Sequence, residues 1–322
     1  MYATKFSFEP ANENSPESVH DNVFWQGAAP RLSVCVPSYR TDCSDLIDAL
    51  ARCKQGSLAE IIIYDDGSQD HTTLAKMQYQ AGCVRAAVRI VSHGLNRGRA
   101  AARNAAIAHA RSEWVLLLDA DMSPDSGDFI LNYLDATERL DDPAVVVGGY
   151  SLRFASPSKK FALHRWQAET SECIDAAKRS QAPGRYVFSS NVLVHKAVLE
   201  ACPFDEKFEG WGWEDTDWGL SVEGQFPIHH IDNPATHLGL DDDKSLMGKY
   251  ARSGANFARM AERHPEAAAA MPLYKAAKTA RGLPLRFVFK GMARLLVKLP
   301  LPVALRGRAL KAWRALVYAE AI

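Results

Sequence analysis

Two aspartates follow directly after a short run of apolar residues in the first half of the chain. Residues 114–118 are all apolar, and Asp119 and Asp121 follow them. The run is too short to cross a membrane and predicts a strand buried on both faces of a parallel sheet. Ligands bind beyond the carboxyl ends of such strands, and alternate residues of an extended segment point the same way. The pair is therefore predicted to face one divalent cation and, through it, a diphosphate. A solvated turn is the alternative.

A second predicted strand, residues 61–64, also ends in acids, Asp65 and Asp66. Further on, a loop with two glycines leads into an alanine-rich helix that begins with Arg99 and Arg103. Cations at a helix N-terminus oppose the helix dipole, so they indicate an anionic ligand nearby, unless they form a solvated basic face. The glycine spacing, Gly-x-x-x-Gly, sets aside the dinucleotide fingerprint and the P-loop.

A third stretch, residues 208–218, combines three tryptophans with glycines and four acids. It fits neither an amphipathic helix nor an alternating strand. Aromatic rings beside carboxylates suit a sugar site, because rings stack on apolar sugar faces and carboxylates bind hydroxyls. The alternative is a tryptophan-rich core corner in which the acids begin a helix that Gly224 ends.

The composition of the chain argues against several classes of function. The 322 residues carry a formal net charge of zero, and the pI near 7.1 offers no global field for nucleic acid. Residues 1–30 lack the basic start and apolar run of a secretory signal and are expected to form a loosely held extension. The six cysteines show neither Cys-x-x-Cys pairs nor metal-ligand spacing, which predicts reduced core residues in a cytoplasmic protein.

Strand-like and helix-like segments alternate from residue 31 onward. This order predicts an α/β fold with a doubly wound sheet and flanking helices. The predicted strands are residues 32–37, 61–64, 85–91, 114–118 and 145–147. The expected parts are the extension 1–30, an α/β domain 31–240 and a helical region 241–322.

The last part of the chain is basic. From Pro272 onward, eleven lysines and arginines stand against a single acid, Glu320, with bulky apolar residues between them. No apolar run approaches the ~18 residues of a spanning helix. Two readings stay open: segments that lie in an anionic membrane interface, and basic helices packed against the α/β domain.

Five short motifs in order resemble the family 2 glycosyltransferases, which are inverting, nucleotide-sugar-dependent enzymes of the GT-A fold. The resemblance covers about residues 31–237. The motifs are Val34-Cys35-Val36-Pro37-Ser38-Tyr39, Asp65-Asp66-Gly67-Ser68, Asn96-x-Gly98 with Arg103-Asn104, Asp119-Ala120-Asp121, and Trp211-Gly212-Trp213-Glu214-Asp215. The last of these is similar to the acceptor-side motif of galactosyl-, N-acetylgalactosaminyl- and chondroitin-type transferases.

The resemblance implies roles for individual residues. The resemblance favours a UDP-sugar as the donor. The residues expected around its nucleotide are Pro37, Tyr39, Arg40, Asp65, Asp66, Arg99, Arg103, Asp119 and Trp211. Asp121 and His237 are expected to ligate a metal, with Asp119 holding it through water or binding the ribose. Oxygen ligands with one imidazole suit Mn²⁺ or Mg²⁺, and the histidine favours manganese.

Asp215 is the expected general base that deprotonates the acceptor hydroxyl, and Glu214 is expected to bind the acceptor or begin a helix. The acceptor would be a glycan or a lipid-linked glycan in polysaccharide or glycoconjugate synthesis. The protein would be cytoplasmic, with peripheral contact to the membrane in one reading. A nucleotidyltransferase and a non-catalytic carbohydrate-binding relative are the alternatives, but the loop after the first strand lacks the glycines of the former.

Overall fold

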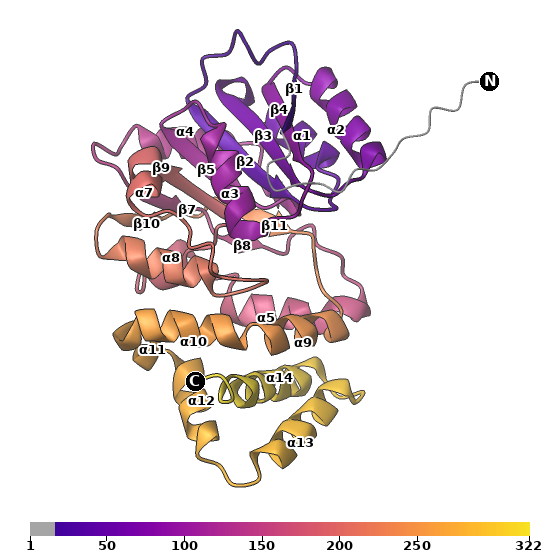
Figure 1. The fold of residues 1–322 in the computed structure, drawn as a ribbon, viewed down its shortest axis with the longest axis vertical. Coiled ribbons are helices and arrows are strands. Elements are labelled where there is room, and N and C mark those ends of the chain that lie inside the picture. The colour runs from indigo at the N-terminus through magenta and orange to yellow at the C-terminus, as the bar shows by residue number, and fades with distance from the viewer. Residues whose placement is uncertain (1–16) are drawn as a thin grey trace, which may run out of the picture.

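An eight-stranded mixed sheet forms the centre of the molecule (Figure 1). The structure, a computed structural model, describes residues 17–322. The strands, in sheet order, are β1 (Ser18–Asp21), β4 (Ala87–His93), β3 (Ala59–Asp66), β2 (Leu32–Ser38), β5 (Trp114–Leu118), β9 (Asn191–His195), β7 (Val145–Val147) and β10 (Ile228–His230). Strands β4, β3, β2 and β5 run parallel, and β9 is antiparallel to β5. The α/β fold with a mixed sheet is thereby confirmed.

Helices cover both faces of this sheet, each by an apolar side. One face carries α1 (Ser44–Arg52), α2 (His71–Cys83) and α4 (Phe129–Thr137). The other carries α3 (Arg99–Ala108), α7 (Lys196–Ala201) and α8 (Glu214–Glu223). The predicted strand of residues 114–118 is buried on both faces except for its first residue, because both helical layers pack against it. The carboxyl ends of β2, β3 and β5 therefore lie together at one edge.

A small second sheet extends this edge. It consists of β6 (Met122–Pro124), β11 (Ala235–His237) and β8 (Tyr150–Ser151), in that order. In the antiparallel pairing of β11 with β6, His237 stands opposite Met122. This register brings His237 beside Asp121, although more than a hundred residues separate them in the chain.

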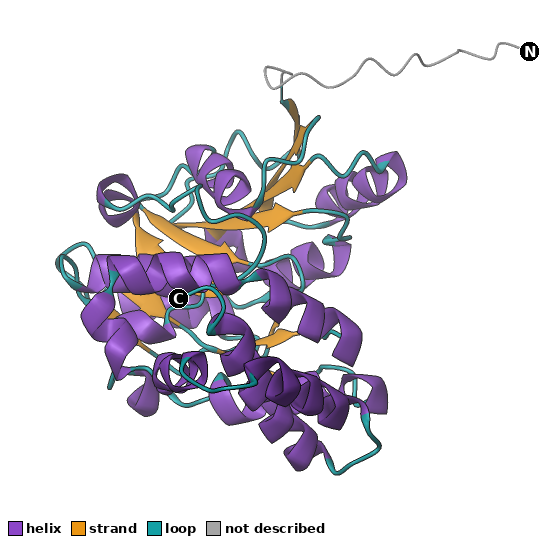
Figure 2. Cartoon of the chain, turned by 60° about the horizontal axis from the view of Figure 1, so that its bottom comes forward, coloured by secondary structure: helices purple, strands orange, loops and turns teal. Residues whose placement is uncertain are grey.

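The remaining helices form a layer below the sheet in Figure 1 and lie in front of the strands in Figure 2. They are α5 (Ala162–Ser171), α9 (Asp243–Arg252), α10 (Gly254–Arg263), α11 (Pro265–Ala270), α12 (Pro272–Arg281), α13 (Arg286–Lys298) and α14 (Val303–Tyr318). Helix α6 (Ala176–Arg179) contacts β10, and short 3₁₀ helices lie at Gly56–Leu58, Lys159–Phe161 and Gly184–Tyr186. Most of this layer shares a separate apolar core. Among the described helices, none is long and apolar enough to cross a membrane.

The expectation of a loosely held extension is wrong for residues 17–30. Strand β1 pairs antiparallel with β4, and the Trp25 ring is buried between the guanidinium groups of Arg89 and Arg111, at 4.3 and 4.1 Å. Buried apolar area and two cation–π contacts hold the segment in place. The rest of the predicted extension lies outside the described residues.

The cysteine prediction is also wrong in part. Cys35, Cys43, Cys53 and Cys202 are buried, but Cys83 is exposed and Cys173 is half-buried. Cys83 is the last residue of α2 and points to the outer side of the helix, while Ala81 and Val84 near it are buried in the apolar layer. Helical spacing alone did not reveal this exposure.

Replacing Trp25 by alanine tests the role of the N-terminal segment. Trp25→Ala should lower the free energy of unfolding by about 3–5 kcal/mol, because a large aromatic side chain leaves a closed site. Val23 is 88% exposed, so Val23→Ala is the matched control and should change little. Urea denaturation of both variants provides the measurement. Equal midpoints for the two would show that the segment does not contribute to the core.

Candidate functional site

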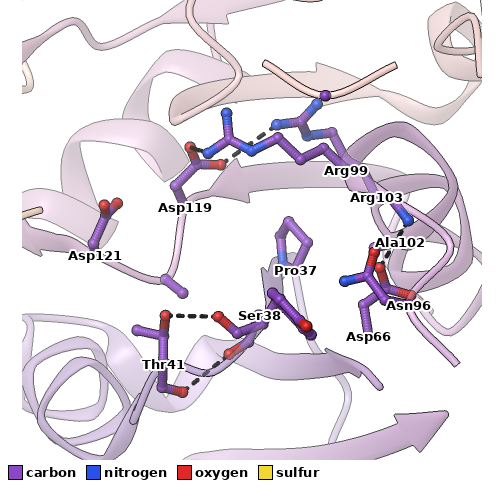
Figure 3. Close-up of a pocket in the computed structure, with 14 residues that line it drawn as sticks. Pro37, Ser38, Thr41, Asp66, Asn96, Arg99, Ala102, Arg103, Asp119 and Asp121 are labelled. Atoms are coloured by element: carbon purple, nitrogen blue, oxygen red, sulfur yellow. Dashed lines mark hydrogen bonds and ion pairs between the residues drawn. The ribbon is translucent and has the colours of Figure 1, made fainter. Parts of the chain in front are cut away.

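A cavity of about 410 Å³ opens at the carboxyl ends of β2, β3 and β5 (Figure 3). Seven predicted site residues line it: Pro37, Tyr39, Asp66, Arg99, Arg103, Asp119 and Asp121. Seven further lining residues were not predicted: Ser38, Thr41, Asn96, Gly98, Ala102, Ala120 and Gly210. The predicted residues Arg40, Asp65, Trp211, Glu214, Asp215 and His237 do not line it. The cavity thus brings together residues from four of the five motifs, and Gly210 precedes the fifth.

The loop after β2 forms one wall. The Ser38 hydroxyl donates to the Thr41 carbonyl at 3.0 Å, which closes a tight turn beside the half-exposed Tyr39 ring. Arg40 has a left-handed backbone with φ of 54°, and its N–H donates to Ser68 Oγ at 2.6 Å. Its guanidinium lies 4.9 Å from the Tyr39 ring centre. Arg40 therefore supports Tyr39 from outside the cavity.

The two acids at the end of β3 differ in orientation. Asp66 accepts hydrogen bonds from the N–H groups of Arg97 and Gly98 at 2.9–3.1 Å, which holds the glycine loop against the cavity. Burial raises the pKa of Asp66, although these N–H groups oppose the shift. Asp65 instead accepts from the hydroxyls of Ser68 and Ser92 and points away. Asp66 is therefore the acid available to a ligand.

The expectation that Asp119 and Asp121 point the same way is wrong. The Met122 N–H donates to the Asp119 carbonyl at 3.1 Å, so the chain turns here instead of staying extended. Asp119 faces Arg103 and Arg99, at 3.4 and 3.6 Å, and Figure 3 shows the Asp121 carboxylate apart from this group. The alternation rule holds only for extended backbone.

Two arginines of α3 connect the donor-side and acceptor-side motifs. Arg103 is 1% exposed, and its Nη2 lies 3.4 Å from Asp119 and its Nη1 3.8 Å from Asp215. Arg99 lies 3.6 Å from Asp119 and 3.7 Å from Glu214. Both Nε and Nη1 of Arg103 are buried without a hydrogen-bond partner among the described residues. Buried N–H donors of this kind suit an anionic ligand that completes their hydrogen bonding.

The start of α8 positions the acceptor-side acids. Trp213 takes a left-handed backbone with φ of 78°, which turns the chain into the helix at Glu214. Asp215 accepts from both the N–H and the hydroxyl of Ser189, just before β9. Glu214 is buried, and burial together with the charge of Asp215 raises the pKa of Glu214. Asp215 is the more exposed of the two carboxylates and so the better candidate base.

A carboxylate–imidazole pair lies at the other side of the site. His237 Nε2 is 3.3 Å from Asp121 Oδ2. Burial disfavours the charged imidazole, but the hydrogen bond and charge of Asp121 outweigh it and raise the pKa of His237. His164 packs its ring 5.7 Å from that of His237, and burial, aided by the charge of His237, lowers the pKa of His164 to about 4.

The residues present fit a divalent cation bound jointly with a ligand. Within residues 17–322, no three His, Cys, Asp or Glu side chains converge as a complete metal site. Asp121 and His237 offer one oxygen and one nitrogen donor, and Mg²⁺-type ions use one or two protein ligands with substrate phosphates. Gly239 packs so closely that an added Cβ would lie 2.0 Å from Asp121 Oδ2. Asp119, engaged by arginines, is not part of this pair.

The predicted sugar-binding tryptophan is placed differently. Trp211 packs against Tyr250 of α9, with ring centres 5.6 Å apart, and Trp213 packs against Phe257 of α10. Trp213 Nε1 donates to the Tyr318 hydroxyl at 3.2 Å. The core-corner alternative therefore describes these rings better, and the C-terminal helices hold the loop that carries Glu214 and Asp215.

Three supporting residues were missed from the sequence: Ser189, Gly239 and His164. Ser189 is followed by a second serine, Ser190, and nothing in the sequence distinguishes its contact to Asp215. Gly239 does carry a signal, because it lies two residues after His237, an expected metal ligand. His164 lies in α5 and meets His237 only through the packing of that helix.

Comparison with known proteins gives the family of this chain. Residues 33–200 match the family model described as glycosyl transferase family 2. Chondroitin synthase of Escherichia coli is 24% identical over 268 residues, which cover 66% of this chain and 38% of that one. Dolichyl-phosphate beta-glucosyltransferase of Saccharomyces cerevisiae is 32% identical over 136 residues, 36% of this chain and 40% of that one. The chain spans two fifths or less of the length of these curated relatives.

Solved structures share the fold. A mannosyltransferase from Pyrobaculum calidifontis, in complex with GDP-Man and Mn²⁺, superposes with a TM-score of 0.58 at 18% identity, covering 96% of this chain and 90% of that one. Residues 1–349 of Staphylococcus aureus TarS, in complex with UDP, give a TM-score of 0.51 at 14% identity, with 90% of each chain covered. Because the family model matches more than half of this chain, the chain belongs to glycosyl transferase family 2.

Proposed function

We propose that this protein transfers a sugar from a nucleotide diphosphate donor, a UDP-sugar, to a hydroxyl of a glycan acceptor with inversion at the anomeric carbon. The contact of Arg103 with both Asp119 and Asp215 carries the proposal. It joins an anion-binding cavity to a carboxylate that can act as base. Transfer needs both functions within one site, because the leaving diphosphate and the attacking hydroxyl lie on opposite sides of the sugar.

The donor nucleotide is proposed to occupy the cavity at the strand ends. Tyr39 and Asp66 stand where a nucleoside would contact the β2 and β3 loops, and Arg99 and Arg103 supply positive charge for a diphosphate. Asp121 and His237 would hold Mn²⁺ or Mg²⁺ together with that diphosphate. A bound cation neutralises the charge that develops on the leaving group. Neighbouring structures with UDP, or with GDP-Man and Mn²⁺, support a nucleotide and a metal.

Asp215 is proposed to take the proton from the acceptor hydroxyl. Its carboxylate is oriented by two hydrogen bonds from Ser189 and retains some exposure to the site. A direct displacement places such a base opposite the leaving group and inverts the anomeric configuration. Glu214, buried and close to Arg99, is better placed to orient that arginine than to exchange protons with an acceptor.

The acceptor is proposed to be a growing glycan or a lipid-linked glycan. Two relatives are named for chondroitin synthesis and for glucosylation of dolichyl phosphate, so a polysaccharide and a lipid carrier both occur in the names of similar proteins, which supports this choice. With such an acceptor, the protein is proposed to act in polysaccharide or glycoconjugate synthesis in the cytoplasm.

Removing the carboxylate of Asp121 tests the metal-assisted donor site. Asp121→Asn should weaken Mn²⁺-dependent binding of UDP by roughly 10–100-fold, a size typical for disturbed metal sites. Isothermal titration of UDP in Mn²⁺ and in EDTA measures this, with GDP as the comparison nucleotide. The exposed Asp141→Asn is the matched control and should bind like the wild type. Equal UDP affinity of the wild type in Mn²⁺ and in EDTA would contradict the metal role.

Replacing the proposed base separates transfer from donor binding. Asp215→Asn should lower the transfer rate by ~10²–10⁴-fold while donor affinity stays unchanged. Release of UDP from a panel of UDP-sugars with a glycan array as acceptor gives the rate, and proton NMR of the product gives its anomeric configuration. Glu223→Gln, an exposed acid at the end of the same helix, is the control. Near wild-type transfer by Asp215→Asn, or a product that retains the donor configuration, would overturn this role.

A further inference from the structure

The two last long helices differ in how they use their apolar residues. Helix α14 buries Leu310, Trp313 and Leu316 in the core of the helical layer. Helix α13 buries only Ala293 and Val297. The packed-helix reading of the basic C-terminal region is therefore right for α14 but leaves the apolar residues of α13 unexplained.

Three exposed apolar residues of α13 form one stripe with Leu299, which follows the helix, and the exposed Phe289 and Leu296 lie beside it. Val288, Met292, Leu295 and Leu299 are spaced i, i+4, i+7 and i+11, which places them along one side of a helix. All four are exposed, Leu295 to 58%. A turn of about 100° per residue sets this stripe on the side away from the two buried residues. The helix thus presents its apolar side to the surroundings, opposite to the pattern of a helix that covers a core.

The stripe continues at the turn before the helix. Leu285, the residue before the helix, has a left-handed backbone with φ of 53° and an exposed side chain. Phe287, within the helix, is 69% exposed but lies on the side that carries Arg294, seven residues later. This turn joins α12 and α13 at the lower end of the molecule in Figure 1. Large apolar side chains gathered at an outer edge indicate a surface that contacts an apolar phase.

Unpaired positive charge lies on α13 itself and on α12, the helix before the turn. Arg294 and Lys298 project from α13, and Lys275, Lys278 and Arg281 project from α12, all exposed. Within residues 17–322, none of these five cations has an acidic partner. The sole acid after Pro272, Glu320, pairs with Lys290 at 2.6 Å.

We propose that the outward side of α13, with the turn before it, docks onto an anionic lipid bilayer. Basic residues would lie at the headgroups, and Val288, Met292 and Leu295 would enter the boundary of the acyl chains. The charge favours a bilayer over a second copy of the chain as the partner. Two copies that met through this face would bring their unpaired cations together, and these would repel each other. A helix of 13 residues is about 20 Å long, suited to lying in the interface and too short to span it.

Docking at α13 would also orient the site. Helix α14 packs on α13, and its Tyr318 hydroxyl accepts from Trp213 Nε1, at the loop that carries Asp215. The membrane surface would thus be connected through one helix to the acceptor side. The proposal itself goes beyond the glycosyl transfer and does not depend on it.

Flotation of the full chain with vesicles tests the docking surface. Vesicles of equal parts phosphatidylcholine and phosphatidylglycerol should carry the protein at low salt, and phosphatidylcholine alone should carry at least roughly tenfold less. Met292→Ser with Leu295→Ser should lose most of the binding, and Arg294→Gln with Lys298→Gln should bind roughly tenfold more weakly. Circular dichroism should show unchanged folding, because these four side chains are exposed.

The matched control removes the same number of positive charges from a different part of the surface. Arg85→Gln with Arg139→Gln removes two exposed cations, neither in an ion pair among the described residues, from the sheet domain, and should float like the wild type. Absence of flotation with the mixed vesicles would overturn the proposal, as would equal loss in the control. A lipid-free dimer in sedimentation velocity that Met292→Ser with Leu295→Ser converts to monomer would assign the face to self-association and overturn it as well.

Discussion

A guanidinium buried at the centre of the site needs negative charge beside it, because an isolated buried cation is costly. Arg103 is that group, and its neighbours Asp119 and Asp215 come from a strand end and from the start of α8. Its Nε and Nη1 still lack hydrogen-bond partners. The arrangement is therefore complete in charge but not in hydrogen bonding, which is the condition expected of a site that awaits an anion. It also ties the loop of Asp215 to the sheet whose strand ends form the cavity.

The rest of the molecule places parts around that centre. The pairing of β11 with β6 brings His237 to Asp121, and the C-terminal helices hold Trp211 and Trp213 and thereby the start of α8. The helical layer is thus part of the scaffold that holds Glu214 and Asp215. Its outer helix, α13, buries only two residues, whereas α14 buries most of its apolar side chains, so α14 belongs to this scaffold and α13 leaves an apolar side exposed.

Much of the fold could be predicted because its signals are local. Apolar runs and periodicity located β2, β3 and β5, and the acids behind them located the cavity edge. The orientation of those acids could not be predicted. Asp119 and Asp121 diverge because of one backbone hydrogen bond in a turn, and Asp65 accepts hydrogen bonds from two serine hydroxyls.

The sequence by itself determined the order of strands and helices, the family and the residue types of the site. Each of these depends on neighbours in the chain, or on motifs read in order. Only the tertiary structure decided that Arg103 meets Asp215, that Trp211 packs in a core and that the apolar side of α13 stays uncovered. These facts depend on which surfaces meet after the chain has folded. Periodicity tells which side of a helix is apolar, but whether another element covers that side is a property of the whole packing.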